Sequence, residues 1–144
     1  MVAAIYNYRR RGDARLVLAR TIYGEARGEG LAGMEAVASV VMNRTVTGGW
    51  WGDDVISVCL KPWQFSVWNA GDPNRALILS KEPGSGDPNF DMAYSVAGRA
   101  MAGDLVDRTN GATHYHTRSV APGWAANEIP VAEIGGHVFY KGIA

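Results

Sequence analysis

Residues 14–30 read ARLVLARTIYGEARGEG, an apolar helical pattern that runs into acidic residues and glycines. Between residues 14 and 26 the apolar side chains recur on one broad face, which predicts a helix packed on the core. At about 100° per residue, Glu25 lies in one narrow stripe with Leu18 and Ile22. We therefore expect this helix to carry Glu25 at the end of its buried face.

The carboxyl group of Glu25 is a candidate general acid. Burial disfavours the ionised form of a carboxyl group, raises its pKa and keeps a proton available for a leaving group. Gly28 and Gly30 suit a helix end and an open turn, which leave room for a substrate to approach. The alternative is an ordinary glutamate at a helix end, solvated or paired with Arg20 or Arg27.

The composition fits a single domain spanning residues 1–144, because 47% of the residues are hydrophobic and can form a core. Lys and Arg together number 14, as do Asp and Glu, so no basic field would recruit nucleic acid. The single cysteine, Cys59, excludes an internal disulfide and is expected to be a small buried apolar residue.

Residues 1–11 lack the basic start and the apolar run of a secretory signal. No stretch of the chain is apolar over the length needed to span a membrane. We therefore expect a protein that is made in the cytoplasm and has no membrane partner.

Further helices and two strands are predicted along the chain. The expected helices cover residues 34–44, 53–60 with Asp53 as its cap, 72–80 and 90–102. Residues 112–117 and 137–140 alternate and are rich in aromatic and β-branched residues, which indicates strands. The fold class is therefore α+β, mainly helical with a small C-terminal β-hairpin or sheet.

The segment from Lys61 to Asn69 combines aromatic rings with amide and hydroxyl groups, a mixture that suits sugar binding. Indole rings stack on the apolar faces of sugars, and amides bond to their hydroxyl or acetamido groups. The alternative is that these tryptophans belong to the core. The candidate cleft residues are Trp63, Gln64, Phe65, Trp68 and Asn69.

His114 and His116 form half of a possible metal site, because alternate residues of a strand face the same side. His137 or a glutamate could supply a third ligand in space, but none is evident, so no metal or other cofactor is expected. The favoured interpretation is that His114, Tyr115 or His116 lines a substrate cleft. The alternative is an ordinary half-buried strand.

Five separated segments of the chain form one recognisable series. They are residues 18–29, with GEARGE at 24–29, and residues 36–44, 64–66, 111–115 and 134–140. In this order they resemble the SleB/CwlJ-type cell-wall hydrolases. The resemblance runs from about residue 16 to residue 140, so it is more specific than any one segment.

This resemblance implies a lysozyme-like fold and an enzyme that acts on peptidoglycan, with Glu25 as the catalytic acid and base. In the lytic transglycosylase members, one carboxyl group protonates the glycosidic oxygen between N-acetylmuramic acid and N-acetylglucosamine. The same group then lets the C6 hydroxyl attack C1, which gives a 1,6-anhydro product. Hydrolysis by the usual two-carboxylate route is the alternative.

Other polar residues in the matching segments are candidates for supporting roles. Glu29 and Glu35 could take a second catalytic role, and Glu29 could instead be a hydrogen-bonding group at the cleft edge. Asn43 and Arg44 could orient the catalytic residue or a sugar, although helix capping explains them equally simply.

The expected partner is the glycan strand of peptidoglycan, bound by a monomer through local contacts, since the net charge is zero. Without a signal sequence, the chain resembles a phage or prophage endolysin that a holin releases from the cytoplasm. Two rival functions remain: a zinc-dependent peptidoglycan amidase that uses His114 and His116, and a non-catalytic glycan-binding module.

Overall fold

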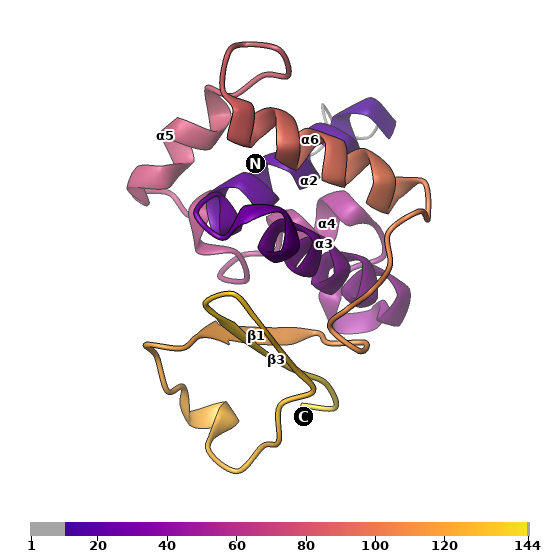
Figure 1. Cartoon of the computed structure of the whole chain (residues 1–144), viewed down its shortest axis with the longest axis vertical. Helices are drawn as coiled ribbons and strands as arrows, with labels where there is room; N and C mark the ends of the chain where they lie inside the picture. Colours follow the sequence, from indigo (N-terminus) through magenta and orange to yellow (C-terminus); the bar gives the residue numbers. More distant parts are fainter. Residues whose placement is uncertain (1–10, 144) are drawn as a thin grey trace.

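A computed structural model describes residues 11–143, with a body of helices above a small sheet (Figure 1). The helices are α2 (Arg11–Ala26), α3 (Gly30–Thr47), α4 (Val55–Leu60), α5 (Pro73–Leu79) and α6 (Pro88–Met101). Short 3-10 helices are η1 (Gly49–Trp51), η2 (Ser66–Trp68) and η3 (Gly123–Ala125), and the strands are β1 (His114–Thr117), β2 (Ala132–Ile134) and β3 (His137–Tyr140). None of the helices in this range is long and apolar enough to cross a lipid bilayer. Residues 1–10, in which the sequence indicates no secretory signal, lie outside the described range.

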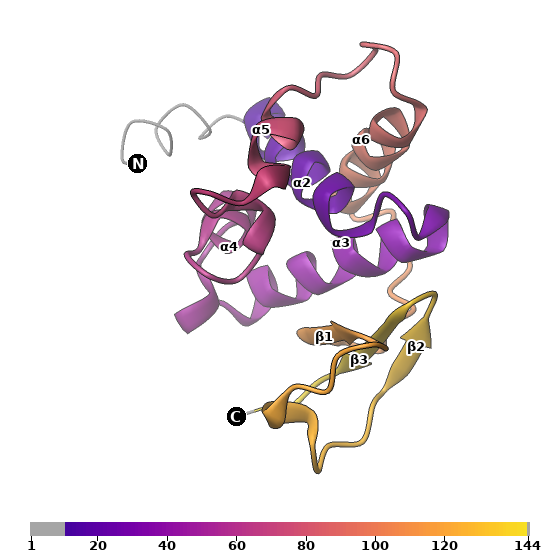
Figure 2. The ribbon, with the colours of Figure 1, turned by 90° about the vertical axis from the view of Figure 1, so that its left-hand side faces the viewer.

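Helix α2 is the centre of the helical body. It contacts α3, α4, α5 and α6, and Figure 2 shows it enclosed by them. Leu18 and Ile22 are fully buried, as the apolar stripe predicts, and Val17 is fully buried as well. Burial of a side chain of this size stabilises the fold by about 1.5–3 kcal/mol. The last turn of α2 therefore has a fixed position, and Glu25 lies on it.

Helix α3 separates the other helices from the sheet (Figure 2). Its predicted apolar stripe, which includes Met34, is buried in the helical core. A second face carries Ala36 and Val40, which pack on Phe139 of β3. The helix begins at Gly30 rather than at Met34, because its first turn is exposed and leaves no apolar pattern in the sequence.

Aspartate caps begin three of the helices. The cap of α4 is Asp54 and not the predicted Asp53: its carboxylate accepts the N–H of Ser57 at 2.8 Å, and the Ser57 hydroxyl accepts the Asp54 N–H at 3.2 Å. This reciprocal pair satisfies two amide groups that would otherwise have no partner. Asp72 and Asp87 cap α5 and α6, and each is followed by a proline that suits the first helical position.

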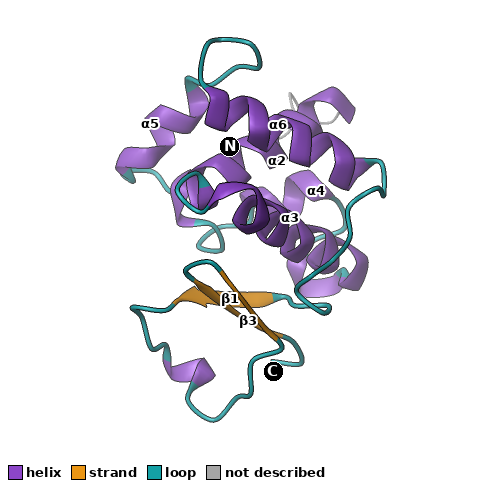
Figure 3. Cartoon of the chain, viewed as in Figure 1, coloured by secondary structure: helices purple, strands orange, loops and turns teal. Residues whose placement is uncertain are grey.

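The sheet has three antiparallel strands in the order β1-β3-β2. Figure 3 shows the helices and the strands in separate parts of the molecule, so the α+β class is confirmed. Strand β3 lies in the middle and pairs Phe139 with Tyr115 on one side and with Ala132 on the other. The sequence predicted β1 and β3 but not β2. Three residues centred on the exposed Glu133 are too few to show an alternating pattern.

The C-terminal end of α2 packs closely against η2. A Cβ atom added to Gly24 would lie only 2.8 Å from Cγ1 of Val67, so the glycine allows η2 to approach the helix closely. Val67 is buried, 3% exposed. This contact brings the segment that follows α4 against the turn that carries Glu25.

Candidate active site

Glu25 lies half-buried on the last turn of α2, beside the buried Ala26. Burial raises the pKa of its carboxyl group, and the negative charge of Asp72 adds to this effect. Neither arginine suggested by the sequence pairs with it. Arg20 donates to the carbonyl of Lys81 and to Glu82, and Arg27 donates to Asn74. The carboxyl group is thus left for another partner.

That partner is Tyr115 of β1. Its hydroxyl donates a hydrogen bond to Oε1 of Glu25. Burial raises the pKa of Tyr115 well above its ordinary value, and the charge of Glu25 raises it further, so the hydroxyl keeps its proton. Because this bond favours the ionised carboxylate, it lowers the pKa of Glu25 and opposes the effect of burial. The sequence named both residues as candidates, and the structure brings them together.

Arg44 forms the third part of the site. It is 6% exposed, its Nε donates to the carbonyl of Thr113 at 2.8 Å, and its guanidinium lies 4.1 Å from the ring centre of Trp51. Burial lowers its pKa to about 10, and its positive charge lowers the pKa of Glu25. Its buried Nη1 has no hydrogen-bond partner. Arg44 therefore offers a positive charge and an unused donor beside the candidate acid.

The position of Arg44 near the site could have been inferred from the spacing of residues in the sequence. Val37, Val41 and Arg44 are spaced by four and three residues, so Arg44 continues a buried stripe just as Glu25 does. A charged residue on such a stripe must meet a partner in the interior.

Glu29 has a structural contact in the described fold. Its Oε2 accepts the backbone N–H of Gly136 at 2.8 Å, at the turn between β2 and β3. A Cβ atom on Gly136 would lie 2.7 Å from Oε1 of Glu29, so the turn fits closely around the carboxylate. This contact fastens the sheet to the beginning of α3 and differs from the second catalytic role that the sequence suggested.

Glu35 and Asn43 also make structural contacts. Glu35 forms an ion pair with Arg99 of α6 at 2.9 Å. Asn43 Nδ2 donates to Asp107 at 3.0 Å and to the carbonyl of Ala112 at 2.9 Å, and so holds the segment before β1 on α3. Both residues therefore have structural partners, and the suggested roles of Asn43 in sugar binding and of Glu35 in catalysis stay predictions.

The segment from residue 63 to residue 69 divides into core and surface. Phe65 is 1% exposed, and Trp68 is half-buried with its Nε1 bonded to the Thr21 hydroxyl at 2.9 Å. The Trp68 bond joins η2 to α2, and the Phe65 ring lies 5.0 Å from the guanidinium of Arg44. Their assignment as cleft residues stays a prediction. Gln64 and Asn69 are half-buried. Trp63, in contrast, is 82% exposed with φ of +68° and remains available to a ligand.

His114 and His116 share the face of β1 opposite to Tyr115, as the alternation predicts. Both rings contact Trp124, with centroids 5.2 and 5.7 Å apart, and Nε2 of His116 lies 2.9 Å from the Tyr140 hydroxyl. Over residues 11–143, no three His, Cys, Asp or Glu side chains gather where they could hold a metal ion.

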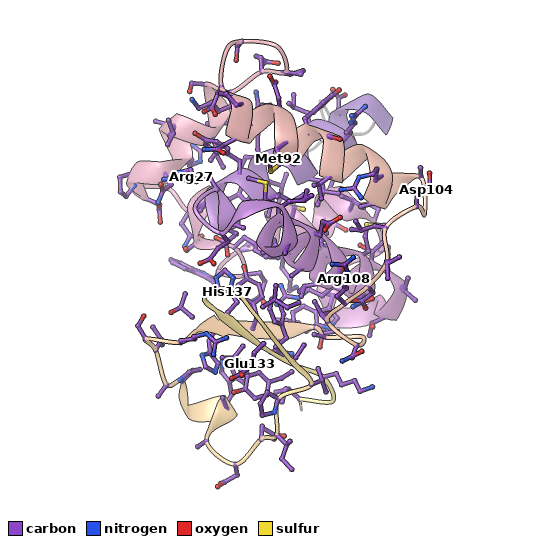
Figure 4. The ribbon with its side chains drawn as sticks, in the orientation of Figure 1. Arg27, Met92, Asp104, Arg108, Glu133 and His137 are labelled. Atoms are coloured by element: carbon purple, nitrogen blue, oxygen red, sulfur yellow. The ribbon has the colours of Figure 1, made fainter. Side chains whose placement is uncertain are left out.

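His137 is a site neighbour that the sequence named only as a possible metal ligand. It is 4% exposed and lies where the sheet meets the helices (Figure 4). Its ring packs edge-on against Tyr115 with centroids 4.9 Å apart, and burial lowers its pKa. A neutral His137 ring thus helps to fix the Tyr115 side chain.

A cavity of about 650 Å³ lies elsewhere, lined by Ala14, Thr45, residues 53–57 and Met101. Its lining includes neither Glu25 nor any aromatic ring. A second cavity of about 420 Å³ is lined by Trp50, Trp51, His114 and Ile143. Because Trp51 also touches Arg44, this smaller cavity adjoins the candidate site, and the larger one does not.

Comparison with solved structures supports the fold. The catalytic domain of the Bacillus cereus SleB protein aligns with a TM-score of 0.70 and 27% identity, covering 89% of each chain. The catalytic domain of the germination-specific lytic transglycosylase SleB from Bacillus anthracis aligns with a TM-score of 0.69 and 27% identity, covering 89% of this chain and 93% of that one. The expected similarity to the SleB catalytic fold is confirmed.

Curated relatives include two spore cortex-lytic enzymes. That of Halalkalibacterium halodurans is 29% identical over 126 residues, which are 85% of this chain and 33% of the relative. That of Oceanobacillus iheyensis is 30% identical over 132 residues, which are 87% of this chain and 40% of the relative. The chain thus spans well under half the length of these relatives.

A family model described as cell wall hydrolase matches residues 28–140, most of the chain. The match begins three residues after Glu25, so the role of Glu25 rests on the geometry of the site. On the extent of this match, the chain belongs to the cell wall hydrolase family.

Proposed function

We propose that this protein cleaves the glycosidic bond between N-acetylmuramic acid and N-acetylglucosamine in peptidoglycan, as a lytic transglycosylase with Glu25 as the general acid and base. The observation that carries the proposal is the half-buried carboxyl group of Glu25, whose pKa is raised by burial and whose Oε1 is held by Tyr115. A carboxyl group with a raised pKa keeps its proton at a pH where an ordinary glutamate has lost it.

The named relatives support the reaction class. Two are spore cortex-lytic enzymes, and one solved structure is that of a lytic transglycosylase. The chain covers nearly all of the solved catalytic domains, so the part that aligns is the part named as catalytic.

The reaction begins with protonated Glu25. Tyr115 occupies Oε1, which leaves Oε2 to give its proton to the glycosidic oxygen. The bond from this oxygen to C1 of the muramic acid breaks, and N-acetylglucosamine leaves with the proton. The carboxylate that remains is stabilised by the Tyr115 hydroxyl and by the charge of Arg44. It also stabilises the positive charge that develops at C1.

In the second half, Glu25 acts as the base. It takes the proton of the C6 hydroxyl, whose oxygen attacks C1 and closes the 1,6-anhydro ring. Glu25 is then protonated again and the enzyme is regenerated. The route needs one carboxyl group, in keeping with the structural contacts of Glu29 and Glu35.

Hydrolysis of the same bond is the second candidate, and Asp72 is the observation that favours it. The charge of Asp72 raises the pKa of Glu25, so Asp72 is a second carboxylate that acts on the acid. Asp72 also caps α5 by accepting the Asn74 N–H at 2.8 Å, which occupies one of its oxygens. In hydrolysis, the second carboxylate would activate a water molecule.

Mass spectrometry of the products separates these reactions. Purified peptidoglycan is digested with the wild type, with Glu25→Gln and with Glu82→Gln, a control on the loop between α5 and α6 whose side chain is 61% exposed. We expect anhydromuramyl ends from the wild type and the control, and a loss of about 10²-fold or more in Glu25→Gln. Reducing muramic ends would establish hydrolysis, freed peptides would establish an amidase, and undiminished turnover by Glu25→Gln would exclude Glu25.

The endolysin role and release from the cytoplasm stay predictions, since neither the fold nor the site bears on them. The same holds for the monomeric state.

A further inference from the structure

A row of aromatic rings leads away from the candidate active site. The ring centroids of Trp50 and Trp51 are 4.9 Å apart, those of Trp51 and His114 are 5.2 Å apart, and those of His114 and Trp124 are 5.2 Å apart. We call these four residues the aromatic ledge. They come from three separate elements, η1, β1 and η3, so the row exists only in the folded chain.

The ledge lies on the face of β1 that Tyr115 does not use. Tyr115 points toward Glu25, while the alternate residue His114 points to the opposite face, where Trp124 covers it. One short strand therefore supplies a ring to the catalytic carboxyl on one face and a ring to the ledge on the other.

The ledge is open to solvent. Trp50 is 64% exposed and Trp124 is 38% exposed, although large rings gain more from burial than most side chains. Beside them lies the cavity of about 420 Å³ that Trp50, Trp51, His114 and Ile143 line. Rings that are held by neighbours and still exposed next to a cavity are typical of a surface that binds a ligand.

The ledge also borders the catalytic residues. The guanidinium of Arg44 lies 4.1 Å from the centre of the Trp51 ring. The positive charge of Arg44 lowers the pKa of both Glu25 and His114. Arg44 thus links the candidate acid to Trp51, the member of the ledge that lies nearest to the site.

Polar groups beside the rings match the chemistry of a sugar. The ammonium group of Lys61 lies 4.4 Å from the centre of the Trp50 ring, and Nδ1 of His114 lies 3.1 Å from the Thr113 hydroxyl. Indole rings accept the apolar face of a pyranose, and Lys61 can donate to its hydroxyl, acetamido or lactyl oxygens.

We propose that the aromatic ledge binds the glycan strand of the substrate beyond the two sugars that flank the cleaved bond. The proposal rests on the proposed function, and it commits to the sugars of the strand rather than to its peptide stems. Stacking on the exposed rings of Trp50 and Trp124 would favour long strands over short fragments, because only a long strand extends beyond the two sugars at the cleaved bond.

Binding is measured in the Glu25→Gln background, so that the strand stays intact. The probe is peptide-free glycan strands, titrated by calorimetry against Glu25→Gln alone and combined with Trp50→Ala or Trp124→Ala. The matched control is Met92→Ala, a residue on α6 that is 37% exposed and lies on the helical body away from the sheet (Figure 4). We expect each ledge variant to bind about two- to tenfold more weakly and the control to bind unchanged.

Equal affinities of the ledge variants and the control would overturn the proposal. A loss of affinity seen only with peptidoglycan that still carries its peptide stems would overturn it as well, since the ledge would then bind the peptides rather than the sugars. Failure of the proposed function would be seen in the product analysis instead: Glu25→Gln would still cleave, or the wild type would release no anhydromuramyl ends. The binding assay does not depend on that result, because it measures affinity for peptide-free strands without cleavage.

Discussion

The Tyr115 hydroxyl donates to Oε1 of Glu25 across 90 positions of the sequence, from a strand of the small sheet to the last turn of α2. Through this bond, a residue of the sheet acts directly on the carboxyl group that the helical body carries. It favours the ionised carboxylate, whereas burial favours the protonated one, so the pKa of Glu25 depends on both parts of the fold.

Replacing Tyr115 with Phe should move the pH profile of the enzyme. The variant keeps the ring but loses the donor that stabilises the carboxylate, so the pKa of Glu25 rises further. A general acid must be protonated, and activity therefore falls as the pH rises through that pKa. We expect the alkaline limb to shift to higher pH, measured by clearing of a peptidoglycan suspension. Tyr23→Phe, which loses a hydrogen bond to Asp87 instead, should show the wild-type profile. An unmoved limb in Tyr115→Phe would argue against Glu25 as the titrating acid.

Glu25→Gln should lose activity without losing stability. The folded state raises the pKa of Glu25, so the native protein holds this proton more tightly than the unfolded chain. The favourable contribution is complete below the unfolded pKa and is lost as the pH rises through the folded pKa. Glutamine can still accept the Tyr115 hydrogen bond. The variant should therefore melt at or above the wild-type temperature at about pH 8, with no advantage near pH 4. Calorimetric scans at both pH values check this, and a lower melting temperature at pH 8 would contradict it.

Arg44→Lys should destabilise the fold although the charge is kept. Lysine cannot lie flat on the Trp51 ring and donate to Thr113 at the same time. We expect a loss of about 1–3 kcal/mol in the free energy of unfolding, measured in urea. Arg118→Lys is the matched control, because its Nε also donates to a carbonyl, that of Gly135, but its side chain is 49% exposed. The control should change stability by less than about 0.5 kcal/mol. Equal losses in both variants would mean that the ring contact contributes nothing.

Gly24→Ala tests the close approach of η2 to α2. Alanine favours a helix by about 1 kcal/mol over glycine, but its Cβ would lie within 3.0 Å of three atoms of Val67. Overpacking of this kind costs about 1–3 kcal/mol, so we expect a net loss of stability. The double variant Gly24→Ala/Val67→Ala should be less destabilised than the two single losses predict. Gly28→Ala, where the added atom meets nothing within 4 Å, serves as the neutral comparison. Additive losses in the double variant would remove the steric explanation.

Local patterns in the sequence gave the helical framework. The stripe through Leu18 and Ile22 is buried as expected, and Asp72 caps α5 as its sequence predicts. Cys59 is buried, as we expected for a single cysteine that has no partner for a disulfide. These predictions succeed because each depends on the periodicity or the capping of neighbouring residues, which the sequence records directly.

Phe65 and Trp68 show that composition alone does not place an aromatic ring. Their segment suggested a sugar cleft; in the structure Phe65 is 1% exposed and Trp68 bonds to Thr21 of α2, while the exposed tryptophans of the ledge lie at positions 50 and 124. An aromatic residue suits a core and a sugar site equally well, and only its surroundings distinguish the two.

The sequence by itself determined the helices and two of the three strands, and it identified Glu25 as a candidate general acid. The tertiary structure decided what Glu25 meets: the docking of β1 below α3 brings Tyr115 to its carboxyl group, and the burial of Arg44 places a positive charge nearby. The same docking sets His114 between Trp51 and Trp124. The physical reason is that helix and strand periodicity is encoded over a few residues. The bond between residues 25 and 115 and the charge that residue 44 adds, in contrast, depend on how whole elements pack.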